Sequence, residues 1–492
     1  MSAPPLGVAV RGVLRDAVDA YRDSPQATAW LRQHLARFDE PLRVAIAGKV
    51  KAGKSTLLNA LVGENVAPTD AGECTRVVTW YRDGHVPRIV LHPHHGAPEP
   101  LTVRRSEGAL VIDMDGRPAE DVERLVVDWP SESLRMATLI DTPGIASTSA
   151  ATSQRTVAFL DPDDETPTEA DAVVYLMRHL HAADAEFLES FRDRGVARAT
   201  AVNTVAVISR ADEIGGGRVD AMFSARGIAS RYRSDPTMRG LCQDVVAVAG
   251  LLAQTGRTLR HAEYTALAGL AALPREELDS ALLSVNRFRR MDGHLSTEER
   301  DRLVHRFGLF GVRLSASLIR QGAQTPDALA AELVGRSGLT ELQNVLHTQF
   351  TGRRDLLKAR SALLAVDRLL DGTRRDGPLA REVERVLAGA HEFAELRLLG
   401  ALRSGAVGLP RPVVAEAERL LGDAGAAPTA RLGLPPDAPA EQVREAVYAA
   451  LDRWQRHAAN PMLSRSATDA CQTVIRTCEG LLAQLAGTVR IP

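Results

Sequence analysis

The chain has 492 residues, of which 45% are hydrophobic and 25% charged, and its 60 basic and 62 acidic residues leave a formal net charge of −2. This length allows roughly two to four domains; the composition excludes a largely disordered chain, and the balanced charge argues against a nucleic-acid partner. Without an apolar run of about 18 residues or a secretory signal, the protein is expected to be cytoplasmic.

The predicted elements begin with a helical segment over residues 8–38, where apolar residues recur every three or four positions. Residues 42–47 form a short apolar strand that ends in a glycine-rich turn, and a helical pattern follows over residues 55–62. Helical patterns such as 183–191 separate later strands, which predicts an α/β fold with a mainly parallel sheet and helices on both faces. The further predicted strands are residues 77–81, 88–91, 137–140, 172–177, 202–208 and 245–249.

After about residue 250 the strand patterns stop, and the chain is predicted to be helical to its C-terminus. Residues 337–350 form a capped amphipathic helix that closes the α/β part and continues with the spacing of a helical bundle. Loops rich in Gly and Pro over residues 404–412 and 424–439 precede two last helices. These helices are residues 441–457 and 468–485.

Residues 48–55 (GKVKAGKS) match the phosphate-loop pattern G-x-x-x-x-G-K-[ST] between a predicted strand and a predicted helix. Lys54 is expected to neutralise the β and γ phosphates, and Ser55 to ligate Mg²⁺. Three of the four lysines lie here, the fourth being Lys358, and crowded ammonium groups would repel one another without a bound anion. The residues expected to hold the nucleotide phosphates are Gly48, Lys49, Val50, Lys51, Ala52, Gly53, Lys54, Ser55 and Thr56.

Two further segments are expected to complete the phosphate and metal site. Asp141-Thr142-Pro143-Gly144 follows a predicted buried strand and forms a D-x-x-G pattern. Asp141 would lie in the outer coordination sphere of Mg²⁺ and help to hold the ion. The Gly144 N–H would sense the γ-phosphate. In the loop of residues 67–76, Thr75 is the preferred residue to close over the γ-phosphate and Mg²⁺ through its hydroxyl, with Thr69 as the rival.

Base selection is expected from Ser209-Arg210-Ala211-Asp212, which follows the strand 202–208 and departs from the usual N/T-K-x-D. Asp212 would accept hydrogen bonds from guanine N1 and the 2-amino group, while the aliphatic stem of Arg210 would lie along the ring. Residues 248–250, at the end of the last strand, are a candidate for a backbone contact to the base.

With these motifs in this order, the chain resembles the bacterial dynamin-like GTPases, and most of all the isoniazid-inducible proteins of actinobacteria. The resemblance covers nearly the whole length and is most specific over residues 44–79 and 137–144, with GLFG (308–311) and SGLTEL (337–342) as looser landmarks. It implies N-terminal helices over residues 1–40 that join a helical bundle, a GTPase domain over residues 41–350, and a helical neck with a shortened trunk over residues 351–492.

The resemblance also implies GTP and Mg²⁺ as ligands, dimerisation of two copies across their nucleotide faces, and coupling of hydrolysis to helical movement. The partners it suggests are a longer dynamin-like paralogue and membrane lipid, at the inner face of the plasma membrane. A stripe of Val447, Leu451 and Trp454 could serve a membrane, but such a stripe is more often bundle core.

The expected catalytic residues are Lys51, Lys54, Thr75 and Gly144, and the expected metal residues are Ser55, Thr75 and Asp141. The usual water-orienting glutamine is missing, because Ile145 follows the D-x-x-G and Val50 fills its place in the phosphate loop. Lys51 matches the position of an arginine finger in the related guanylate-binding proteins. We therefore expect slow turnover alone and faster turnover on dimerisation.

Two alternatives remain open on the sequence alone. The chain could be a nucleotide-gated adaptor that hydrolyses GTP negligibly and regulates a longer partner, or an ATPase with an imperfect base motif. Neither the histidines at 92, 94 and 95 nor the acidic run 161–165 is expected to bind a metal. Cys471 and Cys478 are too far apart along a helix to form a disulfide with each other.

Overall fold

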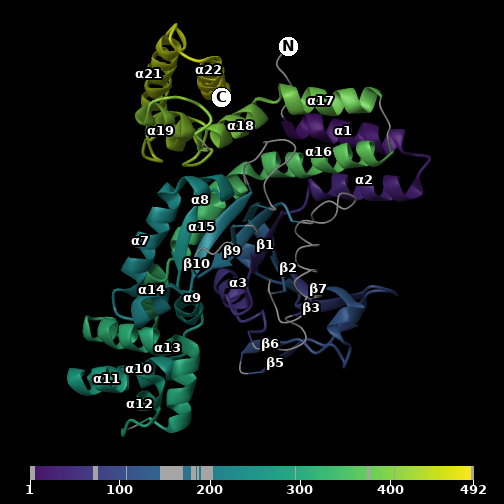
Figure 1. The fold of residues 1–492 in the computed structure, drawn as a ribbon. Coiled ribbons are helices and arrows are strands. Elements are labelled where there is room, and N and C mark those ends of the chain that lie inside the picture. Colours follow the sequence, from purple (N-terminus) through teal and green to yellow (C-terminus); the bar gives the residue numbers. More distant parts are fainter. Residues whose placement is uncertain are drawn as a thin grey trace.

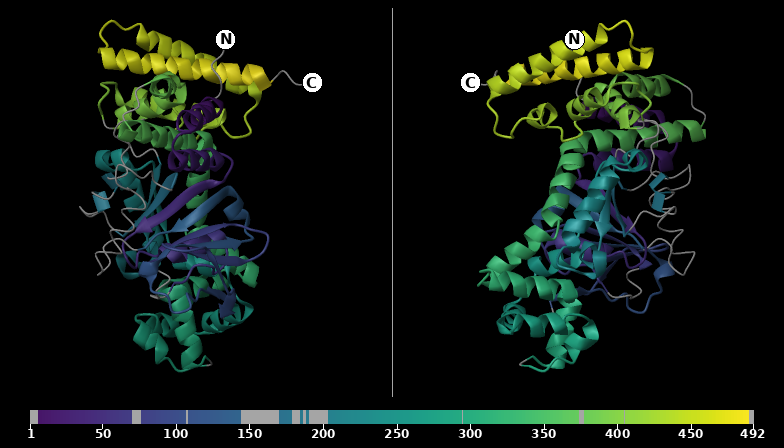
Figure 2. Two further views of the ribbon diagram at one scale, coloured as in Figure 1. Left: turned by 90° about the vertical axis from the view of Figure 1, so that its right-hand side faces the viewer. Right: turned by 60° about the vertical axis from the view of Figure 1, so that its left-hand side comes forward.

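The computed structural model describes residues 6–69, 76–106, 108–143, 170–178, 184–185, 188–189, 203–293, 295–373, 377–403 and 405–488. A central sheet lies between a group of helices formed by the chain's N-terminal and C-terminal parts and a second, separate group of helices at the opposite end (Figure 1). The two views of Figure 2 show the same separation of the two helical groups.

The sheet has nine strands in the order β11-β10-β9-β1-β8-β2-β7-β3-β4. Five neighbouring strands are parallel: β11 (Val245–Val248), β10 (Thr204–Ser209), β9 (Ala172–Met177), β1 (Leu42–Gly48) and β8 (Ala137–Asp141). The other four strands are β2 (Val78–Asp83), β7 (Val122–Trp129), β3 (Arg88–Pro93) and β4 (Glu99–Leu101). β2 is antiparallel to β8 and parallel to β7. β3 is antiparallel to both of its neighbours, β7 and β4. The mainly parallel sheet is confirmed.

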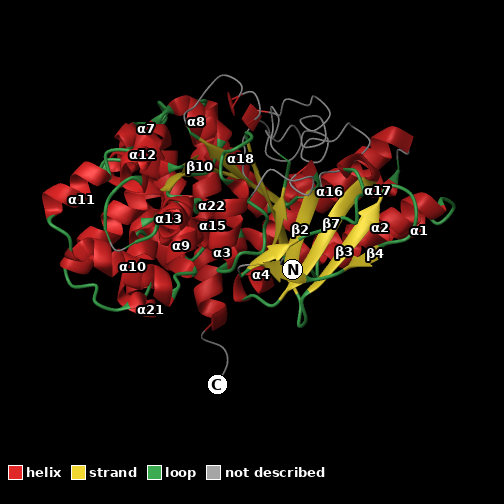
Figure 3. Cartoon of the chain, turned by 90° about the horizontal axis from the view of Figure 1, so that it is seen from below, coloured by secondary structure: helices red, strands yellow, loops and turns green. Residues whose placement is uncertain are grey.

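The sequence analysis missed four strands, all on the β2 side. These are β7, β4 and the separate hairpin of β5 (Arg104–Ser106) and β6 (Ala109–Val111). Seen from below, β2, β7, β3 and β4 spread away from the helices that cover the parallel side (Figure 3). In β7 the charged residues Glu123, Arg124 and Asp128 interrupt the apolar pattern, so no continuous apolar run marks this strand.

Two hydrophobic cores lie on the two faces of the parallel strands, because successive side chains of a strand point to opposite faces. In β1, Ala45 and Ala47 belong to one core and Val44 and Ile46 to the other. The first core is covered by α7 (Ala221–Ser234), α8 (Pro236–Leu241), α9 (Gly250–Arg257) and α14 (Pro326–Arg336). The second is covered by α3 (Lys54–Val62), α4 (Glu132–Met136) and α15 (Leu339–Gln349).

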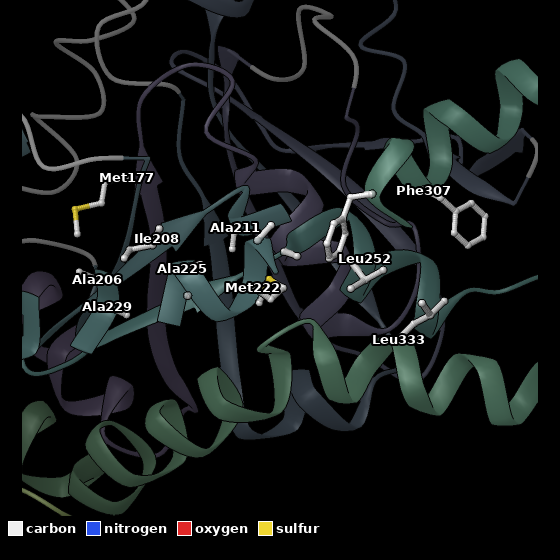
Figure 4. Close-up of a cluster of buried hydrophobic side chains, with 14 of the residues drawn as sticks. Met177, Ala206, Ile208, Ala211, Met222, Ala225, Ala229, Leu252, Phe307 and Leu333 are labelled. Carbon is white, nitrogen blue, oxygen red and sulfur yellow. The ribbon is translucent and has the colours of Figure 1, made fainter. Parts of the chain in front are cut away.

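Four helices between α9 and α14 form the group at the far end of the molecule (Figure 1). They are α10 (His261–Ala272), α11 (Arg275–Ala281), α12 (Val285–Arg289) and α13 (Thr297–Arg320). The first core extends into this group: Figure 4 shows Phe307 of α13 beside Leu252 of α9, with Leu333 of α14 close by. The group is therefore packed on the sheet part through a shared core.

The remaining helices form two further cores above the sheet. The first joins α1 (Leu6–Ala20) and α2 (Pro25–Arg37) to α16 (Arg354–Thr373) and α17 (Pro378–Gly389). The second holds α18 (His391–Arg403), α19 (Arg411–Leu420), α21 (Ala440–Ala458) and α22 (Arg465–Thr488). Trp454 and Val447 are fully buried in it, so their stripe is bundle core. One predicted loop, 424–439, instead contains the short helix α20 (Pro428–Leu432).

Candidate nucleotide-binding site

The predicted site residues gather where the parallel strands end. In the sheet register, Gly48 of β1 lies opposite Leu176 of β9, and Ser209 of β10 lies opposite Val248 of β11. On the other side of β1, Ile46 lies opposite Asp141 of β8. Ligands of open α/β sheets bind beyond these carboxyl ends, at the place where the loops that follow the strands converge.

The phosphate loop has a backbone that only certain residues can adopt. Gly48 has φ 146°, and a Cβ there would lie 2.5 Å from the Leu176 carbonyl oxygen. Gly53 precedes α3 with φ 92°, in the left-handed region that favours glycine. Lys51 has φ 63°, a conformation that costs free energy for a non-glycine residue and that clusters at functional sites. These three positions fix the loop around the N-terminus of α3.

Lys54 is the first residue of α3, and its side chain folds back under the loop. Its Nζ donates to the carbonyl oxygens of Gly48 at 3.1 Å and of Lys49 at 3.3 Å. Burial lowers the pKa of this ammonium group, and the nearby Asp141 carboxylate opposes that shift. The charge therefore sits beneath the ring of backbone N–H groups, where it can meet phosphate oxygens.

The predicted repulsion among the three lysines of the loop is wrong in one respect. Lys49 has a counter-charge, because its Nζ lies 3.0 Å from Oδ2 of the buried Asp184, whose Oδ1 accepts from the Tyr175 hydroxyl at 2.7 Å. Burial and the Asp184 carboxylate raise the pKa of Tyr175. Lys51, by contrast, is exposed and makes no hydrogen bond or ion pair within the described part of the chain. The sequence analysis missed Asp184, which no spacing marks.

Ser55 and Asp141 are brought together as the metal prediction requires. The Ser55 hydroxyl donates to Asp141 Oδ2 at 2.8 Å, and the other carboxylate oxygen, Oδ1, is buried with no hydrogen-bond partner among the described residues. Burial raises the pKa of Asp141, while Lys54 and then Ser55 lower it. A hydroxyl beside an unsatisfied buried carboxylate oxygen fits Mg²⁺, which prefers oxygen ligands.

A cavity of about 150 Å³ joins the phosphate loop to the predicted base motif. Its walls are formed by the start of α3, the ends of β9, β10 and β11, and the start of α9. The residues that line it include Ala52, Gly53, Thr56, Leu176, Ser209, Arg210, Asp212, Glu213, Gly250 and Leu251. Gly250, a candidate for a backbone contact, thus faces the same space as Asp212, whereas the apolar wall Leu251 was not predicted.

The base motif is held in a tight turn after β10. Arg210 adopts a left-handed conformation with φ 52°, and its guanidinium contacts Glu213 Oε1 at 2.8 Å. Asp212 is buried, and burial raises the pKa of its carboxyl. Arg178 reaches the same Glu213 at 3.3 Å. The carboxylate of Glu213 therefore holds the guanidinium of Arg210 beside the cavity.

Several predicted residues lie outside the part of the chain that the structure describes: Thr75, Gly144, Ile145 and residues 161–165. Thr69, the rival of Thr75, is exposed at the end of its described segment. Within the described ranges, no group of three His, Cys, Asp or Glu side chains could hold a metal ion. Cys471 and Cys478 are buried free thiols.

Comparison with known proteins identifies the family. Residues 44–208 match the model of the dynamin family, and the chain is 42% identical over 488 residues to the isoniazid-induced protein IniC of Mycobacterium tuberculosis. That alignment covers 96% of this chain and 98% of the relative. The chain is a bacterial dynamin-like protein of the IniC type. The described phosphate loop and base motif, which lie within or just beyond the matched residues, therefore belong to a dynamin-type GTPase domain.

More distant similarities of this IniC-type chain are also to bacterial dynamins. A bacterial dynamin-like protein of Nostoc punctiforme is 34% identical over 123 residues, which is 22% of this chain and 17% of that protein. A solved structure described as an oligomerised bacterial dynamin pair aligns with 100% of this chain and 76% of its own, with a TM-score of 0.36 and 13% identity, too low a likeness to support a conclusion. In the described part of the IniC-type chain, no helix is long and apolar enough to cross a bilayer.

Proposed function

We propose that the protein binds and hydrolyses GTP with Mg²⁺, dimerises through its nucleotide face, and couples the reaction to movement of its helical parts at the cytoplasmic membrane. The observation that carries the proposal is the shared cavity, in which Gly53 and Thr56 of the phosphate loop face Arg210 and Asp212 of the base motif. Asp212 there suits guanine, because a carboxylate accepts from N1–H and the 2-amino group, whereas adenine presents no such pair of donors. This disfavours the ATPase alternative.

The phosphate end of the site supports transfer chemistry. Lys54 lies under the loop beside the Ser55–Asp141 pair, so the ammonium group and the metal site would face the same phosphate oxygens. Mg²⁺, when bound there, would neutralise charge on the β and γ phosphates. Phosphoryl transfer depends on positioning and charge stabilisation more than on covalent chemistry by the protein.

Dimerisation is proposed because the phosphate loop alone supplies no group to orient water. Val50, in the place of the usual glutamine, is 45% exposed, and Lys51 next to it is exposed in a strained conformation. A second copy seated on this face would cover Val50 and turn the Lys51 ammonium toward the transferred phosphate. A longer dynamin-like paralogue and membrane lipid remain proposed partners.

Coupling to the helices has a route made of one backbone hydrogen bond and the continuous chain that follows it. The Ala249 N–H, next to the cavity residue Gly250, donates to the Ser337 carbonyl at 2.9 Å. Ser337 precedes α15, which continues through a short turn, Thr351–Arg353, into α16. A shift of the loop that touches the base would therefore be passed to the long helix that packs against α1 and α2.

The second candidate is the nucleotide-gated adaptor. The same absence of a water-orienting side chain in the described phosphate loop favours it, since binding requires Lys54 and Asp212 but not a catalytic group. In this case GTP would change the contact between the GTPase domain and the helices, and a partner protein would recognise the changed form by binding to it.

The test measures phosphate release from GTP and from ATP over a hundredfold range of protein concentration, with Lys54→Ala as the blank. We expect a specific GTPase rate that rises with concentration, a rate with ATP at the blank level, and loss of the concentration effect in Lys51→Ala. A GTP rate at the blank level with GTP still bound would overturn hydrolysis and favour the adaptor.

A further inference from the structure

The turn that carries Asp212 is a short 3-10 helix, Ala211–Gly216, whose backbone departs from helical geometry at Ile214 and Gly215. Gly215, Gly216 and Gly217 follow one another with φ 64°, 77° and 71°, all in the left-handed region. At its two ends the Glu213 N–H donates to the Arg210 carbonyl oxygen at 2.9 Å and the Gly217 N–H donates to the Ile214 carbonyl oxygen at 3.3 Å. Glycine loses more conformational entropy on ordering than any other residue, so three in a row need support from outside the turn.

That support comes from Arg313 of α13. One guanidinium nitrogen donates to the Gly217 carbonyl oxygen at 2.6 Å, and another donates to the Leu282 carbonyl oxygen at 2.8 Å. A charged donor makes stronger hydrogen bonds than a neutral one, and the planar guanidinium fixes the direction of both. Arg313 therefore ties the end of the turn to the helical group α10–α13.

Gly217 passes this restraint to the base motif itself. A Cβ on Gly217 would lie 3.4 Å from the carbonyl oxygen of Asp212, so the backbone of Gly217 runs close to that of Asp212. At its other end the turn is anchored by Ala211, which is fully buried in the first core beside Met222 of α7 (Figure 4). Asp212 is thus held between a buried alanine and a glycine that Arg313 fixes.

The same helix also lies close to a second part of the cavity wall. α13 bends at Gly308, which has φ 63°, and a Cβ there would lie 3.6 Å from Cδ2 of Leu251. Leu251 lines the same cavity as Arg210 and Asp212 of the base motif. α13 therefore lies next to a residue of the cavity wall at Gly308 and next to the end of the base-motif turn at Arg313.

We propose that Arg313 is a positioning residue for guanine specificity, acting from the α10–α13 helical group on Asp212 through Gly217. This inference rests on the proposed GTP site and adds the device that makes its base recognition selective. Arg313 is not among the residues that line the cavity. Without it, the glycine turn would sample other conformations, and the Asp212 carboxylate would spend less time where the guanine 2-amino group can reach it.

The test compares equilibrium binding of GTP and ITP to the full-length chain, since inosine lacks only the 2-amino group. The wild-type chain should bind GTP about tenfold more tightly than ITP or better, as expected for one hydrogen bond to a charged group. Arg313→Ala should reduce this ratio by about threefold or more, mainly through weaker GTP binding. Asp212→Ala, which removes the acceptor, marks the ratio expected when recognition is lost.

A matched control lies two turns further along α13. Arg320 donates to two backbone carbonyl oxygens in the same way, those of Ala271 at 2.8 Å and Leu273 at 2.7 Å, but contacts neither the turn nor the cavity. Arg320→Ala should leave the GTP/ITP ratio unchanged. Arg313→Lys keeps the charge but holds fewer carbonyls, so its ratio should lie between those of the wild type and Arg313→Ala, and it serves as the test variant if Arg313→Ala does not fold.

The outcomes separate the two proposals. A wild-type chain that binds neither GTP nor ITP would overturn the proposed function and this inference together. A wild-type chain that binds the two equally would overturn this inference, because the 2-amino group would not be recognised, and would leave GTP binding standing. A wild-type chain that prefers GTP, with Arg313→Ala and Arg313→Lys both keeping the full ratio, would overturn the positioning role alone. A fall in ratio of the same size in Arg320→Ala would also overturn it, because the effect would then be one of general helix stability.

Discussion

Gly338 stands where the chain has no room for a side chain. Its φ is 82°, and a Cβ would lie 2.1 Å from the Ala247 carbonyl oxygen of β11. Gly338→Ala should therefore lower the free energy of unfolding by about 2 to 4 kcal/mol, from left-handed strain and overpacking together. Because Ser337 next to it accepts from Ala249, GTP binding should weaken as well. Thermal unfolding and a GTP titration would measure the two effects.

The control for this substitution is Gly335, three residues earlier on α14. A Cβ there meets nothing within 4 Å. Gly335→Ala should raise the free energy of unfolding by up to about 1 kcal/mol, since alanine favours the helix over glycine. Equal unfolding temperatures for the two variants would show that β11 can move away from Gly338, contrary to the close contact seen here.

His34 makes stability depend on pH. It is buried on α2 against Trp30, with ring centroids 4.4 Å apart, and burial, with the charges of Arg37 and Arg43, lowers its pKa to about 3. Below the ordinary value of 6.5, the unfolded chain binds a proton that the folded chain refuses. The free energy of unfolding should fall by about 1.4 kcal/mol per pH unit from this residue as the pH drops from 6.5 toward 3.

His34→Gln removes this dependence, so its deficit relative to the wild type should shrink between pH 7.5 and pH 5. Unfolding temperatures at three pH values in that range would measure it. His457 is the matched control, because it also lies edge-on to a tryptophan, Trp454, but is only half-buried. A constant difference between His34→Gln and the wild type across the range would mean that His34 is protonated in the folded chain.

At the scale of elements, the central strands were predictable because burial on both faces demands continuous apolar runs. β9 and β1 are buried at every position, and the predicted ranges differ from the observed ones by at most one residue. β7 was not predicted, because Glu123 and Arg124 interrupt its apolar pattern where the strand meets solvent. Its place in the sheet depends on pairing with β2 and β3, which no local pattern records.

The candidate site, like the sheet, was predictable only where a local sequence pattern marks its residues. Motif spacing predicted Lys54, Ser55, Asp141 and Asp212, since each lies within a few residues of a strand end. It could not predict their supports, because Asp184 reaches Lys49 across 135 positions and Arg313 reaches Gly217 across 96. Lys358 shows the same contrast. Its only mark in the sequence is that lysine is rare in this chain, yet it is buried and its ammonium donates to the carbonyl oxygens of Arg37, the last residue of α2, and of Glu40.

At the scale of the whole molecule, polar contacts join the GTPase domain to the last group of helices. Arg239 of α8 pairs with Glu418 of α19, and the Gln349 side-chain amide donates to the Asp423 carbonyl at 2.7 Å. Arg353 donates to the carbonyl of Gly422, and burial, with the charges of Arg403 and Arg431, lowers its pKa to about 10. The proposed movement of these helices would have to break these contacts. Because the groups are polar, water can solvate them while the contacts are broken, and the contacts can then form again.

We call these contacts between the GTPase domain and the last group of helices the joint. The contribution of the Arg239–Glu418 pair to its stability can be measured. Burial raises the pKa of Glu418 and Arg239 lowers it, so removing the arginine would leave a largely buried carboxylate without its charge partner. We expect Arg239→Met to destabilise the joint by about 1 to 3 kcal/mol. Adding Glu418→Met should recover part of that loss, because a buried ion pair replaced by apolar side chains is often neutral. Amide exchange over residues 417–425 and over α8 would measure both changes.

The control for the joint is Arg453, which pairs at 2.6 Å with Glu416, two residues from Glu418 but inside the helical group. Arg453→Met should leave exchange in α8 unchanged, because its contact does not cross to the GTPase domain. If Arg239→Met altered exchange in α8 alone, with residues 417–425 still protected, the joint would be held by Arg353 and Gln349 and not by the ion pair. If GTP accelerated exchange at residues 417–425 in the wild type as Arg239→Met does, the joint would be the contact that nucleotide binding releases.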